Sequence, residues 1–346
     1  MRKIRRAASL ALVQILIFGL FSFPAAALDR RQTELAEEYA FETQTLEQIV
    51  EQFMEAYGLT EENFSLSYHA PGLEETYHFA EYTYRTAGSM YKLALNMYYY
   101  DLEREGEIDP ELIIQEHRKA DDASEEPLKE WPLSEMHYET IVNSDNDMAI
   151  AMLYHLGSFY EYRNLMMRYS DQSYANAYFW NNVINTNYML DVLMYLYENQ
   201  DLYPELMENL KKAAPWFMFK QYVDYPIAHK YGMFDGAYCD AGMIFSEEPF
   251  FLVAMLQLPY EEETEGETPR SEETQESEEA IDGPEVMGRI AELMSAYTDY
   301  RTEKREEEPV VEEPPVEQPI PAGKPILPKK QKPDTHQPAF RPVCHA

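Results

Sequence analysis

Four residues, Ser89-Met90-Tyr91-Lys92, combine a hydroxyl and an amine at a spacing that suits nucleophilic chemistry. On a helix, an offset of three places Ser89 and Lys92 one turn apart on the same face. Free N–H groups at a helix start can hold an oxyanion, and a partly desolvated lysine can accept the serine proton. Taken alone, the same pattern is better explained by a serine that caps a helix and a lysine on its surface.

Two further polar groups lie downstream. Ser144-Asp145-Asn146 falls where a loop should enter a helix, so its hydroxyl could relay a proton and its amide could bind a carbonyl. The alternative is a simple N-cap, since Ser, Asp and Asn are favoured there. Lys230-Tyr231-Gly232 lies on an expected strand, where the cation could hold a substrate carboxylate and Gly232 would let a substrate backbone approach. Its alternative is a surface lysine before a turn.

The order of these groups, S-x-x-K, S-D-N and K-x-G, each on the expected type of element, resembles the serine β-lactamase and penicillin-binding-protein superfamily. The resemblance covers about residues 33–301 and is that of a divergent, class A-like member. It includes segments that look like the nucleophile helix and its terminal turn, the S-D-N helix, the last active-site strand, its neighbour, and the C-terminal helix, at 86–93, 102–109, 143–149, 229–232, 236–242 and 286–300.

The resemblance implies an acyl-transfer site that uses no cofactor. Ser89 would attack the carbonyl of a β-lactam or a D-alanyl peptide, and Lys92 would help to activate it. Ser144 would pass a proton to the leaving nitrogen. On the binding side, Asn146 would bind the substrate amide and Lys230 the substrate carboxylate.

Two more features of the third group bear on substrate binding. The oxyanion would lie between the backbone N–H groups of Ser89 and Met233. Tyr231 stands where the family has Thr or Ser, whose small hydroxyl normally binds the substrate carboxylate. Because a tyrosine hydroxyl lies further out and its ring fills space, we expect carboxylate binding to differ from that of the family.

A second departure concerns release of the acyl group. Class A β-lactamases carry a glutamate, in a loop after the S-D-N helix, that activates the hydrolytic water. Residues 157–187 contain only Glu161 and Asp171 as acids, neither in an E-x-x-L-N setting, and Phe179-Trp180-Asn181-Asn182 occupies the corresponding region. We therefore expect slow deacylation.

Three hypotheses follow, in decreasing order of preference. The first is an envelope serine hydrolase that forms an acyl-enzyme with a β-lactam or a peptidoglycan-derived peptide. The second is a penicillin-binding or peptidoglycan-binding sensor, or a pseudoenzyme, of the same fold. The third is an interaction protein whose acidic insert and tail act at the cell wall, where Lys329, Lys330 and Lys332 could contact anionic polymers.

The first residues predict export. Basic residues among positions 2–6 precede an uncharged apolar run over 7–23, and Ala25-Ala26-Ala27 offers a signal peptidase site. We expect cleavage after Ala27 and a secreted or cell-envelope protein; the alternative is an uncleaved membrane anchor.

Composition narrows the function classes. The net charge of −35 argues against nucleic-acid binding, because phosphate backbones attract basic surfaces. Hydrophobic residues at 45% supply a sizeable core. The histidines show no metal-ligand spacing. Cys239 and Cys344 are too few for a disulfide framework, and the sequence leaves open whether they pair.

The elements expected to position these groups follow an α+β order. A helix over 33–57 precedes strands over 63–68 and 75–84, then a helix over 89–105 that ends at Gly106. The remaining expectations are helices at 145–156, 187–198, 203–213 and 286–300, and strands at 227–231, 237–245 and 250–258. We therefore predict a mainly antiparallel sheet built from both chain ends, flanked by helices, with a helical subdomain.

This pattern also sets the expected domain boundaries. Residues 1–27 form the signal peptide and 30–303 the β-lactamase-like domain. Within that domain, 261–283 is expected to be a disordered acidic insertion, because 261–279 holds ten Glu against one Arg. The Pro-, Glu- and Lys-rich residues 304–346 are expected to form a disordered tail.

Overall fold

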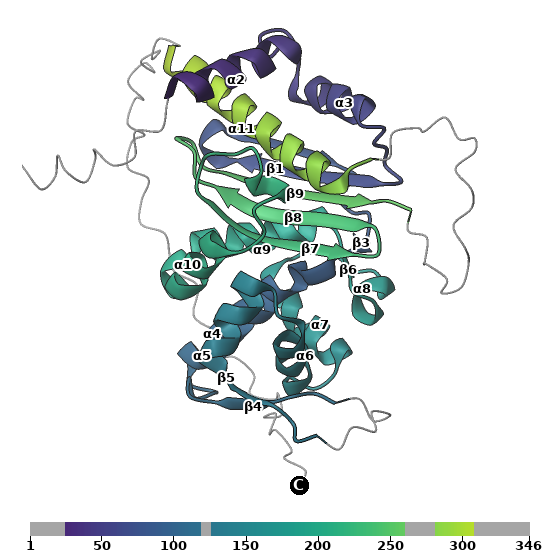
Figure 1. The fold of residues 1–346 in the computed structure, drawn as a ribbon, viewed down its shortest axis with the longest axis vertical. Helices are drawn as coiled ribbons and strands as arrows, with labels where there is room; N and C mark the ends of the chain where they lie inside the picture. Colours follow the sequence, from purple (N-terminus) through teal and green to yellow (C-terminus); the bar gives the residue numbers. More distant parts are fainter. Residues whose placement is uncertain (1–24, 119–125, 260–280, 308–346) are drawn as a thin grey trace, which may run out of the picture. The chain divides into compact units, whose positions relative to one another are not determined.

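A computed structural model describes residues 25–118, 126–259 and 281–307, and its central feature is a five-stranded antiparallel sheet (Figure 1). The strand order is β2-β1-β9-β8-β7. The strands are β1 (Phe64–Ala70), β2 (Glu75–Phe79), β7 (Ile227–Phe234), β8 (Ala237–Ile244) and β9 (Phe250–Gln257). Because β1 pairs with β9, early and late parts of the chain share one sheet, which confirms the predicted α+β class.

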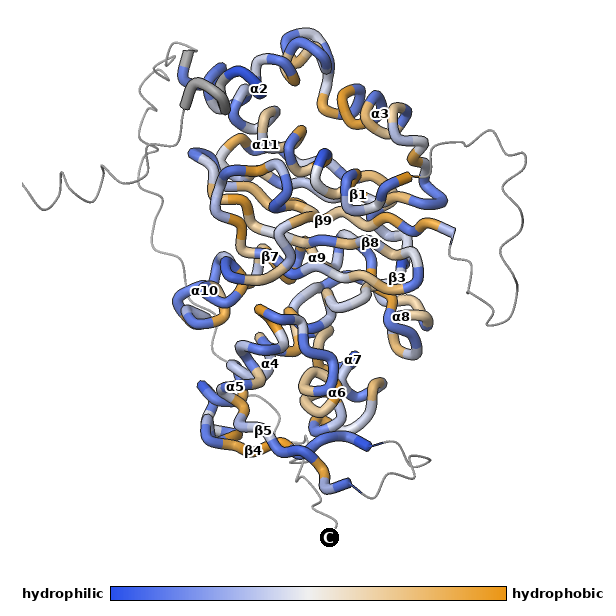
Figure 2. Tube along the Cα trace, viewed as in Figure 1, coloured by the Kyte–Doolittle hydropathy of each residue, from blue (hydrophilic) through white to orange (hydrophobic). Residues whose placement is uncertain are grey.

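The central strand β9 is buried on both faces. Leu252, Ala254 and Leu256 face one apolar cluster, whereas Phe251, Val253 and Met255 face another. This alternation follows the two-residue period of a strand, and it explains why the sequence of β9 is continuously apolar. Figure 2 shows most of β9 towards the hydrophobic end of the scale.

Helices cover the two faces of the sheet. One face packs against a layer seen above the sheet in Figure 1, which consists of α2 (Ala25–Glu38), α3 (Leu46–Ala56) and α11 (Gly283–Glu307). On the other face lie α9 (Thr186–Glu198) and α10 (Pro204–Lys212). Below them is a helical subdomain of α4 (Lys92–Glu105), α5 (Leu133–Tyr138), α6 (Asn146–His155), α7 (Phe159–Met166) and α8 (Asn176–Trp180). None of the described helices combines the length and hydropathy that crossing a membrane requires.

Two short strand pairs complete the fold. The strand β3 (Arg85–Thr86) pairs with β6 (Val183–Ile184), and this pairing holds the chain just before Ser89. The strand β4 (Ile113–Gln115) pairs with β5 (Glu130–Pro132) at the far end of the helical subdomain.

Three predicted boundaries differ from the structure. The helix expected over 33–57 is two helices, because Thr45 and Gln48 form a capping box that starts a new helix and Ala40 has a φ of 46°. The strand expected over 75–84 ends at Phe79, where Ala80 adopts a φ of 48°. The last helix runs to Glu307, beyond the expected start of the tail. The signal peptide before residue 25, most of the acidic insertion and the tail beyond 307 lie outside the described residues.

Candidate active site

Ser89 lies in a tight 3-10 turn over Gly88–Tyr91 that leads directly into α4. Gly88 adopts a φ of +51°, which an L side chain rarely tolerates. Ser89 is half-buried, and within the described part of the chain its Oγ has no hydrogen-bond partner. The hydroxyl of Ser89 is therefore not engaged by another described residue.

Lys92 is fully buried at the first position of α4. Its Nζ donates to the backbone oxygen of Ser144 at 2.6 Å and to Asn146 Oδ1 at 2.7 Å, and lies 3.2 Å from Ser144 Oγ. Two N–H groups thus have firm acceptors, which leaves the third position of the nitrogen for a proton or a lone pair. Burial lowers the pKa of Lys92 to about 8, because desolvation disfavours the charged amine.

The S-D-N group combines a helix N-cap with two side chains that contact Lys92. Asp145 is the N-cap of α6, where its carboxylate accepts from the backbone N–H of Met148 at 2.8 Å. Ser144 and Asn146, on either side, point their side chains to Lys92. Ser144 holds a left-handed φ of 58°, a strained backbone of the kind that clusters at functional sites.

Lys230 reaches the same serine from the edge strand β7. Its Nζ lies 3.0 Å from Ser144 Oγ and 4.3 Å from the centre of the Tyr231 ring. Lys230 is fully buried, and both this burial and the neighbouring Lys92 hold its pKa well below the usual value. Two lysines thus meet at one hydroxyl. The ring of Tyr231 also packs against the apolar cluster beneath α11.

His229 precedes Lys230 but belongs to the sheet interior. It is fully buried, its Nδ1 lies 2.9 Å from Asp240 Oδ1, and its Nε2 lies 3.2 Å from the backbone oxygen of Ala213. These contacts keep the His229 ring in the sheet interior, on Asp240 and the backbone of Ala213.

The strand β7 approaches the Gly88–Tyr91 turn, here called the nucleophile turn after the candidate nucleophile Ser89, backbone to backbone. A Cβ on Gly232 would lie 2.1 Å from the Ala87 oxygen and 2.9 Å from the Ser89 nitrogen. A Cβ on Gly88 would lie 2.6 Å from the Met233 nitrogen. Only glycines permit this approach. It places the backbone nitrogens of Ser89 and Met233 on either side of the contact between the turn and the strand.

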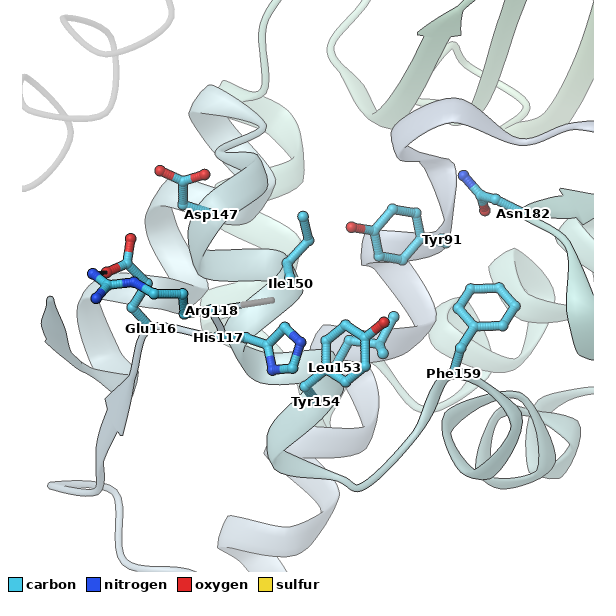
Figure 3. A pocket seen from close by; sticks show the side chains of 10 residues that line it. All are labelled: Tyr91, Glu116, His117, Arg118, Asp147, Ile150, Leu153, Tyr154, Phe159 and Asn182. Atoms are coloured by element: carbon cyan, nitrogen blue, oxygen red, sulfur yellow. Dashed lines mark ion pairs between the residues drawn. The ribbon is translucent and has the colours of Figure 1, made fainter. Parts of the chain in front are cut away.

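A groove of about 690 Å³ opens beside the nucleophile turn (Figure 3). Tyr91 and Asn182 lie at one end, and Glu116, Arg118 and Asp147 lie at the other. The middle is apolar and aromatic, and it is lined by Ile150, Leu153, Tyr154, Phe159 and the ring of His117, which stacks on Tyr154 at 3.6 Å. No sequence motif indicates this groove, because its residues come from separate segments of the chain.

Neither acid of residues 157–187 is free to act as a base near Ser89. Glu161 closes a capping box at the start of α7, where its carboxylate accepts from the backbone N–H of Ser158 at 2.7 Å. Asp171 is exposed and lines a separate surface pocket with Asp191 and Glu198.

Two residues absent from the predicted site support the nucleophile turn. The side chain of Asn182 donates to the Gly88 oxygen at 2.9 Å, and its backbone oxygen accepts from the Ala87 N–H at 2.9 Å. Arg163, fully buried on α7, donates to Asn182 Oδ1 at 3.2 Å. No sequence signal distinguishes them, since neither stands in a recognisable motif.

Comparisons with known proteins agree with this geometry. The sequence profile of the beta-lactamase enzyme family matches residues 45–278, which is most of the chain. The protein therefore belongs to this family, within a superfamily of serine hydrolases. No curated protein sequence matches this chain.

Solved structures of similar fold come from the same superfamily. A point mutant of PBP-A, solved as an acyl-enzyme complex with penicillin G, is 14% identical, with a TM-score of 0.57 and coverage of 75% of this chain and 98% of that one. A β-lactamase from Chitinophaga pinensis is 15% identical, with a TM-score of 0.55 and coverage of 72% and 97%. A β-lactamase from Sphaerobacter thermophilus is 20% identical, with a TM-score of 0.52 and coverage of 68% and 91%.

Proposed function

We propose that this protein is an exported serine hydrolase that forms an acyl-enzyme through Ser89 with β-lactams or D-alanyl peptides and releases it slowly. The observation that carries the proposal is the convergence of Lys92, Ser144, Asn146 and Lys230 in one hydrogen-bonded cluster beside Ser89. Two buried lysine amines at one hydroxyl are costly to desolvate, and such perturbed groups cluster at functional sites.

Acylation would proceed with one net proton transfer. The neutral amine of Lys92 accepts the proton of Ser89 Oγ while Oγ bonds to the substrate carbonyl carbon. The backbone N–H groups of Ser89 and Met233 hold the resulting oxyanion. As the carbon–nitrogen bond breaks, Ser144 gives its proton to the leaving nitrogen and regains one from the Lys92 ammonium. The acyl group then remains on Ser89 as an ester.

The surroundings of Ser89 offer a binding site for each end of a substrate. Lys230 would hold a substrate carboxylate, whose negative charge would restore the protonated amine that burial disfavours. The groove beside Tyr91 is large enough for the acyl arm of the substrate, and its apolar middle suits an aromatic or aliphatic group.

We infer slow deacylation because no acid described near the site is free to activate a hydrolytic water. Glu161 is engaged in its capping box, so it does not replace the base that class A β-lactamases use. A non-hydrolytic sensor of penicillins or peptidoglycan, or a pseudoenzyme, is the second candidate, and the same observation favours it.

Intact-protein mass spectrometry after incubation with a panel of penicillins and cephalosporins tests the proposal. We expect a persistent adduct on the wild type and none on Ser89→Ala. An adduct without any substrate turnover would favour the sensor. Neither adduct nor substrate loss with any compound would refute acylation of Ser89 by β-lactams.

Export is a separate part of the proposal. The basic start, the apolar run and the alanine triplet before residue 28 support secretion or a cell-envelope location. N-terminal sequencing of protein recovered from the producing cells would give Leu28 as the first residue if cleavage follows Ala27. A retained Met1 would contradict it.

A further inference from the structure

The side chains of Arg163 and Asn182 form a line of hydrogen bonds that ends at the peptide unit preceding Ser89. Arg163 Nη2 donates to Asn182 Oδ1 at 3.2 Å, and Asn182 Nδ2 donates to the Gly88 oxygen at 2.9 Å. The Gly88 carbonyl belongs to the same peptide group as the Ser89 N–H, which is one of the two proposed oxyanion donors. The line therefore connects a buried cation to the oxyanion site.

The orientation of the Asn182 amide is fixed by its two neighbours. A guanidinium can only donate hydrogen bonds, and a backbone carbonyl can only accept them. Oδ1 must therefore face Arg163 and Nδ2 must face Gly88. All the dipoles along the line then point the same way, with their positive ends toward the place where negative charge develops on the substrate.

Arg163 is buried in a manner that stability does not explain. Its exposed fraction is 0%, and among the described residues no carboxylate forms an ion pair with it. Its Nη2 also donates to the backbone oxygen of Asn181 at 3.3 Å, but its Nε and Nη1 have no hydrogen-bond partner in the described part of the chain. The rings of Phe159, Tyr162 and Tyr178 lie around the guanidinium, with centroids 5.0, 5.6 and 4.7 Å away, and they replace only part of the lost hydration.

We propose that Arg163 and Asn182 are positioning residues that polarise and orient the Gly88–Ser89 peptide so that the Ser89 N–H stabilises the acylation oxyanion. A hydrogen bond accepted by a peptide oxygen makes the N–H of the same peptide a better donor, and charged donors strengthen such chains. The backbone oxygen of Asn182 also accepts from the Ala87 N–H. Residue 182 therefore holds the backbone on both sides of the Ala87–Gly88 peptide bond. The inference rests on the proposed acylation of Ser89.

Two substitutions separate this role from a structural one. Asn182→Asp keeps the size of the side chain and an acceptor for Arg163, but an ionised carboxylate cannot donate to Gly88. Arg163→Met keeps an apolar stem among the three rings and removes the charge. A purely structural role predicts that any loss of function follows a loss of stability. The positioning role predicts slower acylation at an unchanged or higher Tm, because Arg163→Met removes the unpaired buried charge and the carboxylate of Asn182→Asp pairs with it.

The control is Arg168→Met. Arg168 also lies over aromatic rings, those of Tyr98 and Tyr169, but it pairs with Asp101 and does not touch the nucleophile turn. We expect this variant to acylate at the wild-type rate.

The experiment measures the second-order rate of labelling by a fluorescent penicillin and by a fluorophosphonate, together with Tm. A fluorophosphonate needs only an activated serine and an oxyanion site, so it reports on the line even if β-lactams are not substrates. We expect both test variants to react about 10- to 100-fold more slowly, less than the ~10²–10³ lost with a direct donor. Rates within about twofold of the wild type, or losses that track Tm, would overturn the inference.

A spectroscopic measurement keeps the inference testable if neither probe reacts, an outcome that would refute the proposed acylation. The backbone ¹⁵N resonance of Ser89, assigned by its disappearance in Ser89→Ala, reports the hydrogen bond at the Gly88 oxygen. We expect an upfield shift in Asn182→Asp and Arg163→Met and none in Arg168→Met. An unmoved resonance in both test variants would refute the line.

Discussion

At the residue scale, the buried amine of Lys92 determines how acylation should depend on pH. Its pKa is lowered to about 8 by burial, and only the neutral amine can take the proton of Ser89. The labelling rate should therefore be low well below pH 8, rise through that value and level off above it. Lys92→Gln should lower the rate by about 10²–10⁴-fold.

The pH profile of penicillin labelling, measured between about pH 6 and pH 10, checks this expectation. In Lys92→Gln the residual rate should lose the rise near 8. A flat wild-type profile would show that another group accepts the proton.

Ser144 is the residue at which both lysines meet, so its hydroxyl should matter for chemistry more than for folding. Ser144→Ala removes the 3.0 Å and 3.2 Å contacts and the proton route to the leaving nitrogen. We expect acylation to slow by at least about 100-fold. Ser158→Ala is the matched control, because Ser158 also stands between a loop and a helix but only caps α7.

Labelling rates and denaturant unfolding of the two serine variants distinguish the roles. Ser158→Ala should lose about 1 kcal/mol of unfolding free energy and keep its labelling rate. The reverse pattern, with Ser144→Ala active and Ser158→Ala inactive, would contradict the assignment of the proton route.

At the element scale, the close approach of β7 to the nucleophile turn depends on glycine. In Gly232→Ala the new Cβ would lie 2.1 Å from the Ala87 oxygen, so the strand must move away from Ser89. We expect a loss of about 1–3 kcal/mol in unfolding free energy and a disrupted oxyanion site. Gly106→Ala is the comparison, since a Cβ there meets nothing within 4 Å and only the φ of +72° is unfavourable.

Urea unfolding and penicillin labelling of both variants test this expectation. Gly106→Ala should lose stability but keep the labelling rate, because Gly106 only ends α4. A Gly232→Ala variant that labels normally would show that the two backbones can separate without affecting the oxyanion donors.

The same scale shows what could be predicted from the sequence. Five candidate site residues were recognisable because each lies in a short motif with a defined local structure: Ser89, Lys92, Ser144, Asn146 and Lys230. The structure brings them together, although no local pattern fixes the distances between them. The groove, Arg163 and Asn182 were not recognisable, since their contacts arise only when α7, β6 and the nucleophile turn pack. Helix periodicity likewise could not show that Thr45 restarts the helix.

At the scale of the whole molecule, the end of α11 locates the boundary of the folded unit. The compact unit ends at Glu307, although the sequence suggested a tail from residue 304. Thr302 is buried, and Arg305 hydrogen-bonds to the Gly72 oxygen and pairs with Glu248 at 2.6 Å. The last turns of α11 therefore hold two chain turns at one end of the sheet.

The contacts of Thr302 and Arg305 predict different outcomes for two truncations. A chain that ends at Glu307 should keep the Tm and labelling rate of the full chain, because it retains all of these contacts. A chain that ends at Arg301 should lose about 2 °C or more in Tm, because it removes the buried Thr302 and frees Glu248 and the Gly72 oxygen from Arg305. Differential scanning calorimetry of the two truncated chains beside the full chain measures the difference. Equal Tm values for both truncations would place the boundary of the folded unit before Thr302, whereas a drop in the longer one would place it beyond Glu307.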